Sequence, residues 1–231
     1  MICSNTWERM WRYQSVGVRG AVVAMLASVA VSIGAPASAG EPIKIVAFGD
    51  SLVAGYGLSA KAAFPTKLEA ALKAKGHDVT IINAGVSGDT TAAGRARFDW
   101  AVPDNADAVI LELGANDALR GISVKQTREN LTAILDKLKT RNVPVLLAGM
   151  KAPANWGKDY QATFDGLFPK LANQFDAILY PFFLEGVVLD AKLNQADGMH
   201  PNAAGVDVIV ERILPQVEEL VARAKQSANA G

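Results

Sequence analysis

Short apolar segments alternate along the chain with longer stretches in which apolar side chains recur every three or four residues. The short segments are rich in valine, isoleucine and leucine and are bounded by glycine, proline, asparagine or aspartate. That pattern is typical of buried strands. They cover residues 43–48, 79–83, 108–113, 143–148 and 177–180. Because strands that alternate with helices pair in parallel, the pattern predicts an α/β fold.

The longer stretches carry the start and stop signals of amphipathic helices. Pro65 suits the first turn of one helix and Gly76 its C-cap, while Ser123 and Gln126 form a capping-box pair ahead of another. The last helix has an apolar face made of Val206, Ile209, Val210, Ile213, Val217 and Leu220. We therefore expect a three-layer α/β/α sandwich with a five-stranded parallel sheet in the flavodoxin-like order 2-1-3-4-5.

The beginning of the chain differs from the rest. A basic lead precedes a thirteen-residue apolar run over residues 21–33, followed by Ala37-Ser38-Ala39, which fits a signal-peptide cleavage site. An uncleaved membrane anchor is the alternative, but a spanning helix needs about 20 apolar residues. The sequence predicts a cleaved signal over residues 1–39 and one domain over 40–231, exported to the periplasm or secreted. Translation from Met10 would leave this prediction unchanged.

Charge and cysteine content narrow the partners of the mature domain. The chain has 23 basic and 23 acidic residues, and losing the leader with its three arginines and Glu8 leaves a formal charge of −2. This near-zero net charge gives no indication that the domain binds nucleic acid or an anionic membrane surface. The single cysteine, Cys3, lies in the leader, so the mature domain has no disulfide. We expect no stable membrane anchor, and a monomer or small homo-oligomer.

Candidate reactive residues follow the predicted strands. Ser51 comes directly after the first strand, Gly85 after the second and Asn116 after the third, while Asp197 and His200 lie in the loop beyond the fifth. In the order 2-1-3-4-5 the carboxyl ends of the first three strands are neighbours, and ligands bind at this edge of an open α/β sheet. The sequence therefore brings four distant segments to one rim.

These residue types suit nucleophilic catalysis. A serine nucleophile needs a base with a pKa near neutrality, and of the two histidines only His200 lies on the correct rim, since His77 precedes the second strand. Asp197 can orient His200, and the Ser51 and Gly85 amides with the Asn116 side chain can bind an oxyanion. Each residue also has a structural interpretation as a turn or cap residue. A metal site is disfavoured, because two ligands are too few.

Competing motifs are incomplete. Gly55-Tyr56-Gly57 lacks the third glycine of a dinucleotide fingerprint, and the chain has neither a Walker-type lysine nor a Gly-x-Ser-x-Gly elbow. Glu112 stands inside the third apolar segment and resembles a general base. We interpret it as a structural residue neutralised by a partner such as Arg120 or Arg95.

The four strand-end segments resemble the signatures of the SGNH (GDSL-type) hydrolases, in particular the secreted branch of thioesterase I/protease I/lysophospholipase and arylesterases. The matching segments are Gly49-Asp50-Ser51-Leu52, Asn83-Ala84-Gly85, Gly114-Ala115-Asn116-Asp117 and Asp197-Gly198-Met199-His200. The resemblance implies that Ser51 is the nucleophile, that Asp197 and His200 complete a triad, and that Ser51, Gly85 and Asn116 form the oxyanion hole. It also implies that no cofactor or metal is needed.

The resemblance makes the substrate an acyl ester, a thioester or a lipid, without fixing the length of the acyl chain. We expect the loops after the third and fourth strands to line the acyl pocket through Leu119, Ile122, Met150, Ala152 and Trp156. Two other functions stay open from the sequence: a carbohydrate O-acetyl esterase, and a non-catalytic exported protein that binds a ligand with the same fold.

Overall fold

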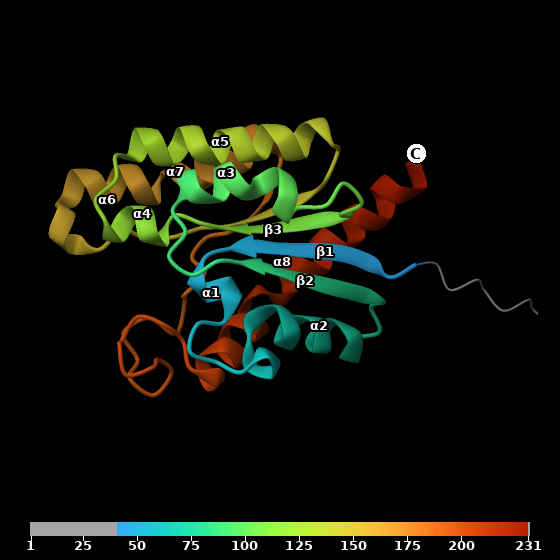
Figure 1. Ribbon diagram of the computed structural model, residues 1–231, viewed down its shortest axis with the longest axis horizontal. Coiled ribbons are helices and arrows are strands. Elements are labelled where there is room, and N and C mark those ends of the chain that lie inside the picture. Colours follow the sequence, from blue (N-terminus) through green and yellow to red (C-terminus); the bar gives the residue numbers. More distant parts are fainter. Residues whose placement is uncertain (1–40, 231) are drawn as a thin grey trace, which may run out of the picture. The chain divides into compact units, whose positions relative to one another are not determined.

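The structure, a computed structural model, describes residues 41–230 of the 231 (Figure 1). The predicted leader and its cleavage site lie outside the described residues. Within residues 41–230, no helix is both long and apolar enough to cross a membrane.

The centre of the fold is a five-stranded sheet in the order β2-β1-β3-β4-β5, with every pair parallel. The strands are β1 (Ile43–Gly49), β2 (Val79–Gly85), β3 (Ala108–Glu112), β4 (Val145–Ala148) and β5 (Ile178–Tyr180). This confirms the predicted fold class and strand order. β4 begins two residues later than predicted, directly after Pro144, which has no amide hydrogen to donate to a ladder.

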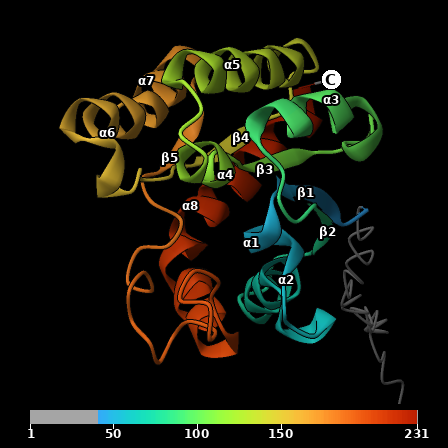
Figure 2. The ribbon, with the colours of Figure 1, turned by 60° about the vertical axis from the view of Figure 1, so that its left-hand side comes forward.

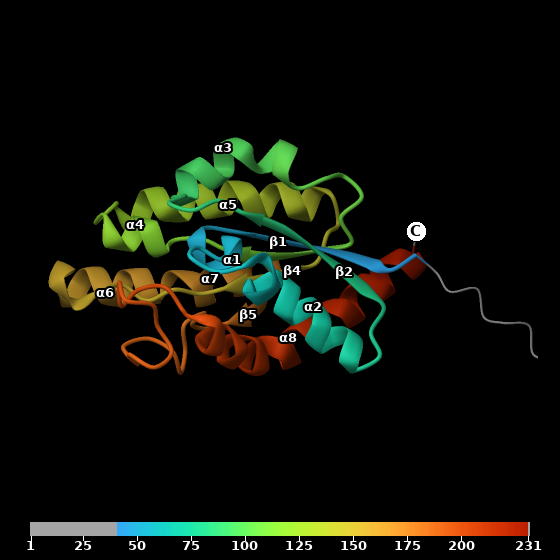
Figure 3. The same ribbon diagram turned by 60° about the horizontal axis from the view of Figure 1, so that its bottom comes forward.

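Helices cover both faces of the sheet and complete the three predicted layers (Figures 1 and 3). α3 and α5 pack together on one face with α7 beside α5, and α2 and α8 pack together on the other face. The helices are α1 (Ser51–Ala54), α2 (Phe64–Ala74), α3 (Thr91–Ala101), α4 (Ala115–Leu119), α5 (Val124–Thr140), α6 (Lys158–Asp165), α7 (Leu167–Phe175) and α8 (Ala203–Ala230), with 3₁₀ turns η1 (Ala60–Ala62) and η2 (Ala154–Trp156).

The start and stop signals act as expected. Pro65 lies in the first turn of α2, and Gly76 follows its end with a φ of 85°. The Ser123 hydroxyl accepts from the Gln126 amide at 3.3 Å and donates to the Gln126 side chain at 2.9 Å. All six residues of the predicted apolar face of α8 are buried. The helix continues through Pro215 and ends at Ala230.

The sheet register aligns the ends of three strands. Gly49, the last residue of β1, is paired with Gly85 of β2 on one side and with Glu112 of β3 on the other. Figure 2 brings this carboxyl edge forward, with α1, α4 and the loop between β5 and α8 around it. The edge therefore holds the segments that carry the candidate site.

Candidate active site

Ser51 is held in a sharp turn between β1 and α1. The Asp50 side chain caps α1 by accepting from the Leu52 amide at 3.0 Å, and Ser51 is the first helical residue, with 9% of its surface exposed. Gly49 is required at the end of β1, because a Cβ there would lie 2.5 Å from Oε2 of Glu112. The turn thus presents the serine hydroxyl at the edge of the sheet.

The loop between β5 and α8 places His200 beside this hydroxyl. Nε2 of His200 lies 2.9 Å from Oγ of Ser51, although 149 residues separate them in the sequence. Nδ1 of His200 lies 2.6 Å from Oδ2 of Asp197. The structure therefore brings together the three residues that the sequence singled out, in the order hydroxyl, imidazole and carboxylate.

Asp197 is fixed by its own turn. Its Oδ1 accepts from the backbone amides of Met199 at 2.9 Å and His200 at 3.0 Å. These two bonds, together with the His200 side chain, lower the pKa of Asp197 to about 2. Asp197 is therefore ionised near neutral pH and accepts a hydrogen bond from Nδ1 of His200. Nε2 is then free to accept the proton of Ser51.

Two contacts of the histidine loop are not foreseen by the sequence reasoning. The Tyr56 ring lies over the His200 ring with 4.6 Å between centroids. The Gln195 side chain donates to the Tyr56 carbonyl at 2.7 Å and to the Pro201 carbonyl at 2.9 Å, and so ties the loop to the segment after α1. The sequence marks Gly55-Tyr56-Gly57 only as an incomplete dinucleotide fingerprint, and no sequence signal marks Gln195.

Asn116 lies near the start of α4, which follows Gly114 with a φ of 120°. Its Nδ2 donates to Oδ2 of Asp50 at 3.0 Å, so the side chain is anchored to the residue before the serine. An amide nitrogen has two hydrogens. One is used by Asp50, and the other remains for a ligand.

Gly85 has a different local environment. A Cβ on it would lie 2.2 Å from the Ala54 backbone nitrogen, so a glycine is needed here for the close approach of α1. Its amide donates to Oδ1 of Asn83 at 3.0 Å. Gly85 can serve an oxyanion only as a donor shared with Asn83 or after the Asn83 side chain turns away, and its role stays a prediction.

Glu112 is completely buried, but the predicted arginine partners are wrong. Arg95 donates to Asn130 and Arg120 to the Gly88 carbonyl, because both arginines lie on outer segments of the fold. Instead Oε2 of Glu112 accepts from the Asp50 amide at 3.2 Å. Burial, reinforced by repulsion from Asp50, raises the pKa of Glu112 well above its usual range. Burial also raises the pKa of Asp50, to about 6.

The five expected pocket residues divide into two groups. Leu119 and Trp156 are exposed by 53% and 43%, and Ile122 is partly buried. Met150 and Ala152 are buried in the core. Trp156 lies against Gly121, where a Cβ would come within 2.7 Å of the indole ring. Leu119, Ile122 and Trp156 therefore have accessible surface for contact with a substrate, and the role of all five residues in an acyl pocket stays a prediction.

No group of three or more His, Cys, Asp or Glu side chains within residues 41–230 is arranged to hold a metal ion. The chemistry open to this site is that of a serine hydroxyl hydrogen-bonded to an imidazole, with amide donors beside it.

Comparison with known proteins agrees with this geometry. The profile of the GDSL-like Lipase/Acylhydrolase family matches residues 47–208, a range that includes all five proposed triad and oxyanion residues. The chain belongs to this family, which confirms the resemblance found in the sequence.

Several relatives cover most of the described fold. The chain is 39% identical to thioesterase 1/protease 1/lysophospholipase L1 of Escherichia coli (strain K12) over 77% of its own length and 84% of the relative. It is 37% identical to an arylesterase of Vibrio mimicus over 75% of its length and 88% of the relative. Among solved structures, the SGNH-hydrolase family esterase AlinE4 is 50% identical with a TM-score of 0.67, covering 79% of this chain and 98% of that one.

Proposed function

We propose that this protein is a carboxylic ester hydrolase that acts through an acyl-enzyme on Ser51. The observation that carries the proposal is the pair of hydrogen bonds through His200, at 2.9 Å to Ser51 and at 2.6 Å to Asp197. A nucleophile within reach of a base, which is in turn oriented by a third group, is the arrangement that covalent catalysis requires. Membership of an acylhydrolase family supports the same conclusion.

The reaction proceeds in two acyl transfers. His200 takes the Ser51 proton at Nε2 while Oγ attacks the ester carbonyl, and the carbonyl oxygen becomes an oxyanion. Amide donors stabilise that charge, with Asn116 the best placed because one of its two hydrogens is not used by Asp50. The imidazolium then gives its proton to the leaving alcohol or thiol. Water, activated by His200, repeats the sequence on the acyl-enzyme and releases the acid.

We infer that the preferred substrates are short acyl or aryl esters. Leu119, Trp156 and Tyr56 offer exposed apolar surface, which can contact an aryl or short acyl group without a deep channel. Met150 and Ala152 are buried by contrast, with 2% and 5% of their surfaces exposed. The leader expected over residues 1–39 supports export, so the esters would be met outside the cytoplasm.

Labelling and mutation test the chemistry. A fluorophosphonate probe should modify Ser51, identified by mass spectrometry of the labelled peptide, and Ser51→Ala should lose both labelling and turnover of p-nitrophenyl acetate while keeping its circular dichroism spectrum. Turnover by Ser51→Ala near the wild-type rate would refute the assignment. A wild-type protein that folds but is not labelled would support the non-catalytic ligand-binding alternative.

A series of p-nitrophenyl esters and thioesters tests the substrate class. We expect kcat/KM to be greatest at two to four acyl carbons. A maximum beyond eight carbons would contradict the proposal and indicate lipid substrates. Matched alcohol and thiol esters of one acyl group separate esterase from thioesterase preference, and acetylated sugars test the O-acetyl esterase alternative.

A further inference from the structure

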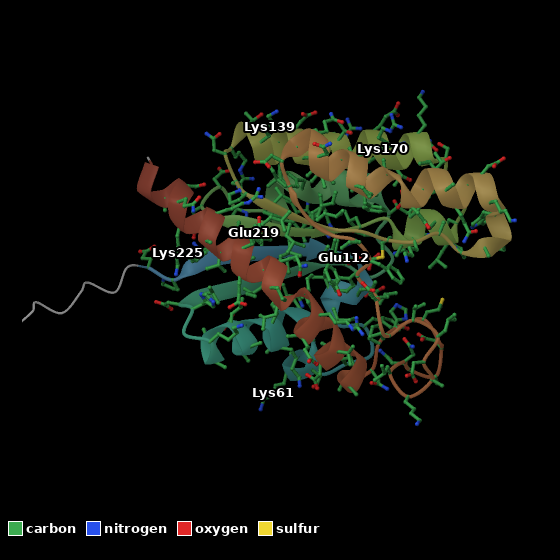
Figure 4. The ribbon with its side chains drawn as sticks, turned by 180° about the vertical axis from the view of Figure 1, so that it is seen from behind. Lys61, Glu112, Lys139, Lys170, Glu219 and Lys225 are labelled. Atoms are coloured by element: carbon green, nitrogen blue, oxygen red, sulfur yellow. The ribbon has the colours of Figure 1, made fainter. Side chains whose placement is uncertain are left out.

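Glu112 is a buried acid that the reaction itself does not use. It is the last residue of β3, has no exposed surface, and lies at the carboxyl edge of the sheet directly behind the Ser51 turn. Figure 4 shows Glu112 in the interior, with the labelled lysines on outer parts of the molecule. Its Oε2 accepts from the Asp50 amide, and its Oε1 has no hydrogen-bond partner within residues 41–230.

Within residues 41–230, no cationic side chain forms a salt bridge with Glu112. Asp50 contacts Glu112 from the β1–α1 turn. His200, in the loop before α8, lowers the pKa of Asp50 but does not affect that of Glu112. The buried cation near this turn is Arg97 of α3, which donates to Oδ2 of Asp89 at 2.5 Å and to the Gly49 carbonyl at 2.8 Å. Arg97 is therefore already paired, and within residues 41–230 neither Asp50 nor Glu112 forms a salt bridge.

Two adjacent buried carboxyls cannot both be ionised at low cost, so one of them keeps a proton. Asp50 is the better anion of the two, because its oxygens accept from the Leu52 amide and from Nδ2 of Asn116. Glu112 accepts from a single backbone amide. Consistent with this assignment, burial raises the pKa of both carboxyls, the nearby Asp50 raises the pKa of Glu112 further, and the hydrogen bonds from Leu52 and Asn116 lower the pKa of Asp50.

We propose that Glu112 is a positioning residue which, as a neutral acid, holds Asp50 and through it the Asn116 amide in place for the oxyanion. The proposal rests on the function proposed above. Asp50 acts as the connector: its backbone amide contacts Glu112, and its carboxylate binds one hydrogen of Asn116. The second hydrogen of Asn116 then points to the reacting carbonyl oxygen. This chain of contacts explains why the residue before Asp50 is a glycine, since any Cβ on Gly49 would displace Glu112.

Two substitutions at Glu112 separate the loss of the ionisable acid from the loss of the hydrogen-bonding group. Glu112→Gln keeps a neutral group with a donor and an acceptor, and we expect its kcat on p-nitrophenyl acetate to stay within about threefold of wild type. Glu112→Leu removes both, and we expect kcat per fluorophosphonate-titrated site to fall about 10- to 100-fold with little change in KM. The expected fall is smaller than the loss of one oxyanion donor, about 10²- to 10³-fold, because Asn116 is loosened and not removed.

A double mutant tests whether Glu112 acts through Asn116. In an Asn116→Ala background, Glu112→Leu should lower kcat by less than about twofold, because residues in one network are not additive. Glu69→Leu is the matched control, since Glu69 also accepts a backbone amide, that of Ile81 at 2.7 Å, but lies on α2 away from the site. Its kcat per titrated site should equal wild type.

Three results would overturn the proposal. The first is a kcat for Glu112→Gln as low as that for Glu112→Leu, and the second is an undiminished kcat per site for Glu112→Leu. If Glu112→Leu does not fold, ¹³C-carboxyl NMR of glutamate-labelled wild type decides. We expect one glutamate carboxyl at pH 7 with the chemical shift of a neutral acid, absent in Glu112→Gln, and finding every glutamate ionised is the third. This NMR measurement reports the protonation of Glu112 even if Ser51 has no esterase activity, so the failure of one proposal can be distinguished from the failure of the other.

Discussion

Asn116 is the residue at which the geometry makes its most quantitative prediction. The Asn116→Ala substitution removes an amide that is anchored to Asp50 at 3.0 Å and is proposed to donate its other hydrogen to the oxyanion. The Ser51–His200–Asp197 contacts do not involve Asn116, so the nucleophile and its base stay in place. Within the reaction, the substitution should therefore impair only the stabilisation of the oxyanion charge.

Two magnitudes follow from the contacts. Loss of one oxyanion donor lowers kcat by about 10²- to 10³-fold, or about 3–4 kcal/mol in the activation free energy, with KM nearly unchanged. The buried Asp50 carboxylate also loses a partner, which reduces the free energy of unfolding by about 1.5–3 kcal/mol. Because the pKa of Asp50 is already raised to about 6, it takes up a proton more readily without Asn116. The stability loss should therefore be largest above pH 6 and shrink below it.

Steady-state hydrolysis of p-nitrophenyl acetate measures the first effect, with rates expressed per fluorophosphonate-titrated site, and urea unfolding at pH 5 and pH 8 measures the second. Asn130→Ala is the matched control, because Nδ2 of Asn130 also donates to a side chain, Oγ1 of Thr91 at 3.2 Å, outside the site. Its kcat should equal wild type. A kcat for Asn116→Ala within fivefold of wild type would refute the oxyanion role of Asn116.

Three further predictions follow from other contacts. Asp197→Asn should lower kcat by roughly 10⁴-fold without unfolding the protein, because an amide oxygen still accepts the two backbone amides but cannot stabilise the imidazolium. Esterase activity within fivefold of wild type would count against this prediction. The pKa of Asp197 falls from an ordinary 3.8 to about 2 on folding, so its contribution to stability is present above pH 4 and is lost as the pH falls toward 2. The urea midpoints of wild type and Asp197→Asn should therefore converge over that range. A constant difference between the two midpoints would contradict this. Asp117→Ala should lower the free energy of unfolding by roughly 3 kcal/mol, since the buried Asp117 carboxylate accepts from the Thr91 amide at 2.8 Å and from the hydroxyls of Thr91 and Thr127. An unchanged urea midpoint would show that these donors find other partners.

Much of the site could be predicted from the sequence because it depends on strand ends. A buried strand of five or six residues ends in a turn residue, and a parallel sheet brings such ends to one edge. The placement of Ser51, Asn116 and His200 at this edge could therefore be predicted from the sequence pattern alone. The order of the strands and the apolar face of α8 followed from periodicity in the same way.

Contacts between side chains from different segments could not be predicted in this way. Gln195 ties the histidine loop to Tyr56 across 139 residues, and no local pattern encodes such a bond. Met150 follows a strand on the same edge as the other pocket candidates, but packing against the core decided that its side chain is buried. Sequence position gives the edge of the sheet, whereas the direction of each side chain depends on its neighbours.

The sequence by itself determined the class of fold and the edge of the sheet at which the proposed nucleophile, base and orienting acid lie, because local pattern sets each strand and parallel strands end together. Only the tertiary structure decided the partner of Glu112. The sequence reasoning gave this buried acid an arginine, since an isolated buried charge is costly. The fold instead places it against the Asp50 amide, with no salt bridge to it within residues 41–230, and we propose that a carboxyl buried beside another carboxyl keeps its proton.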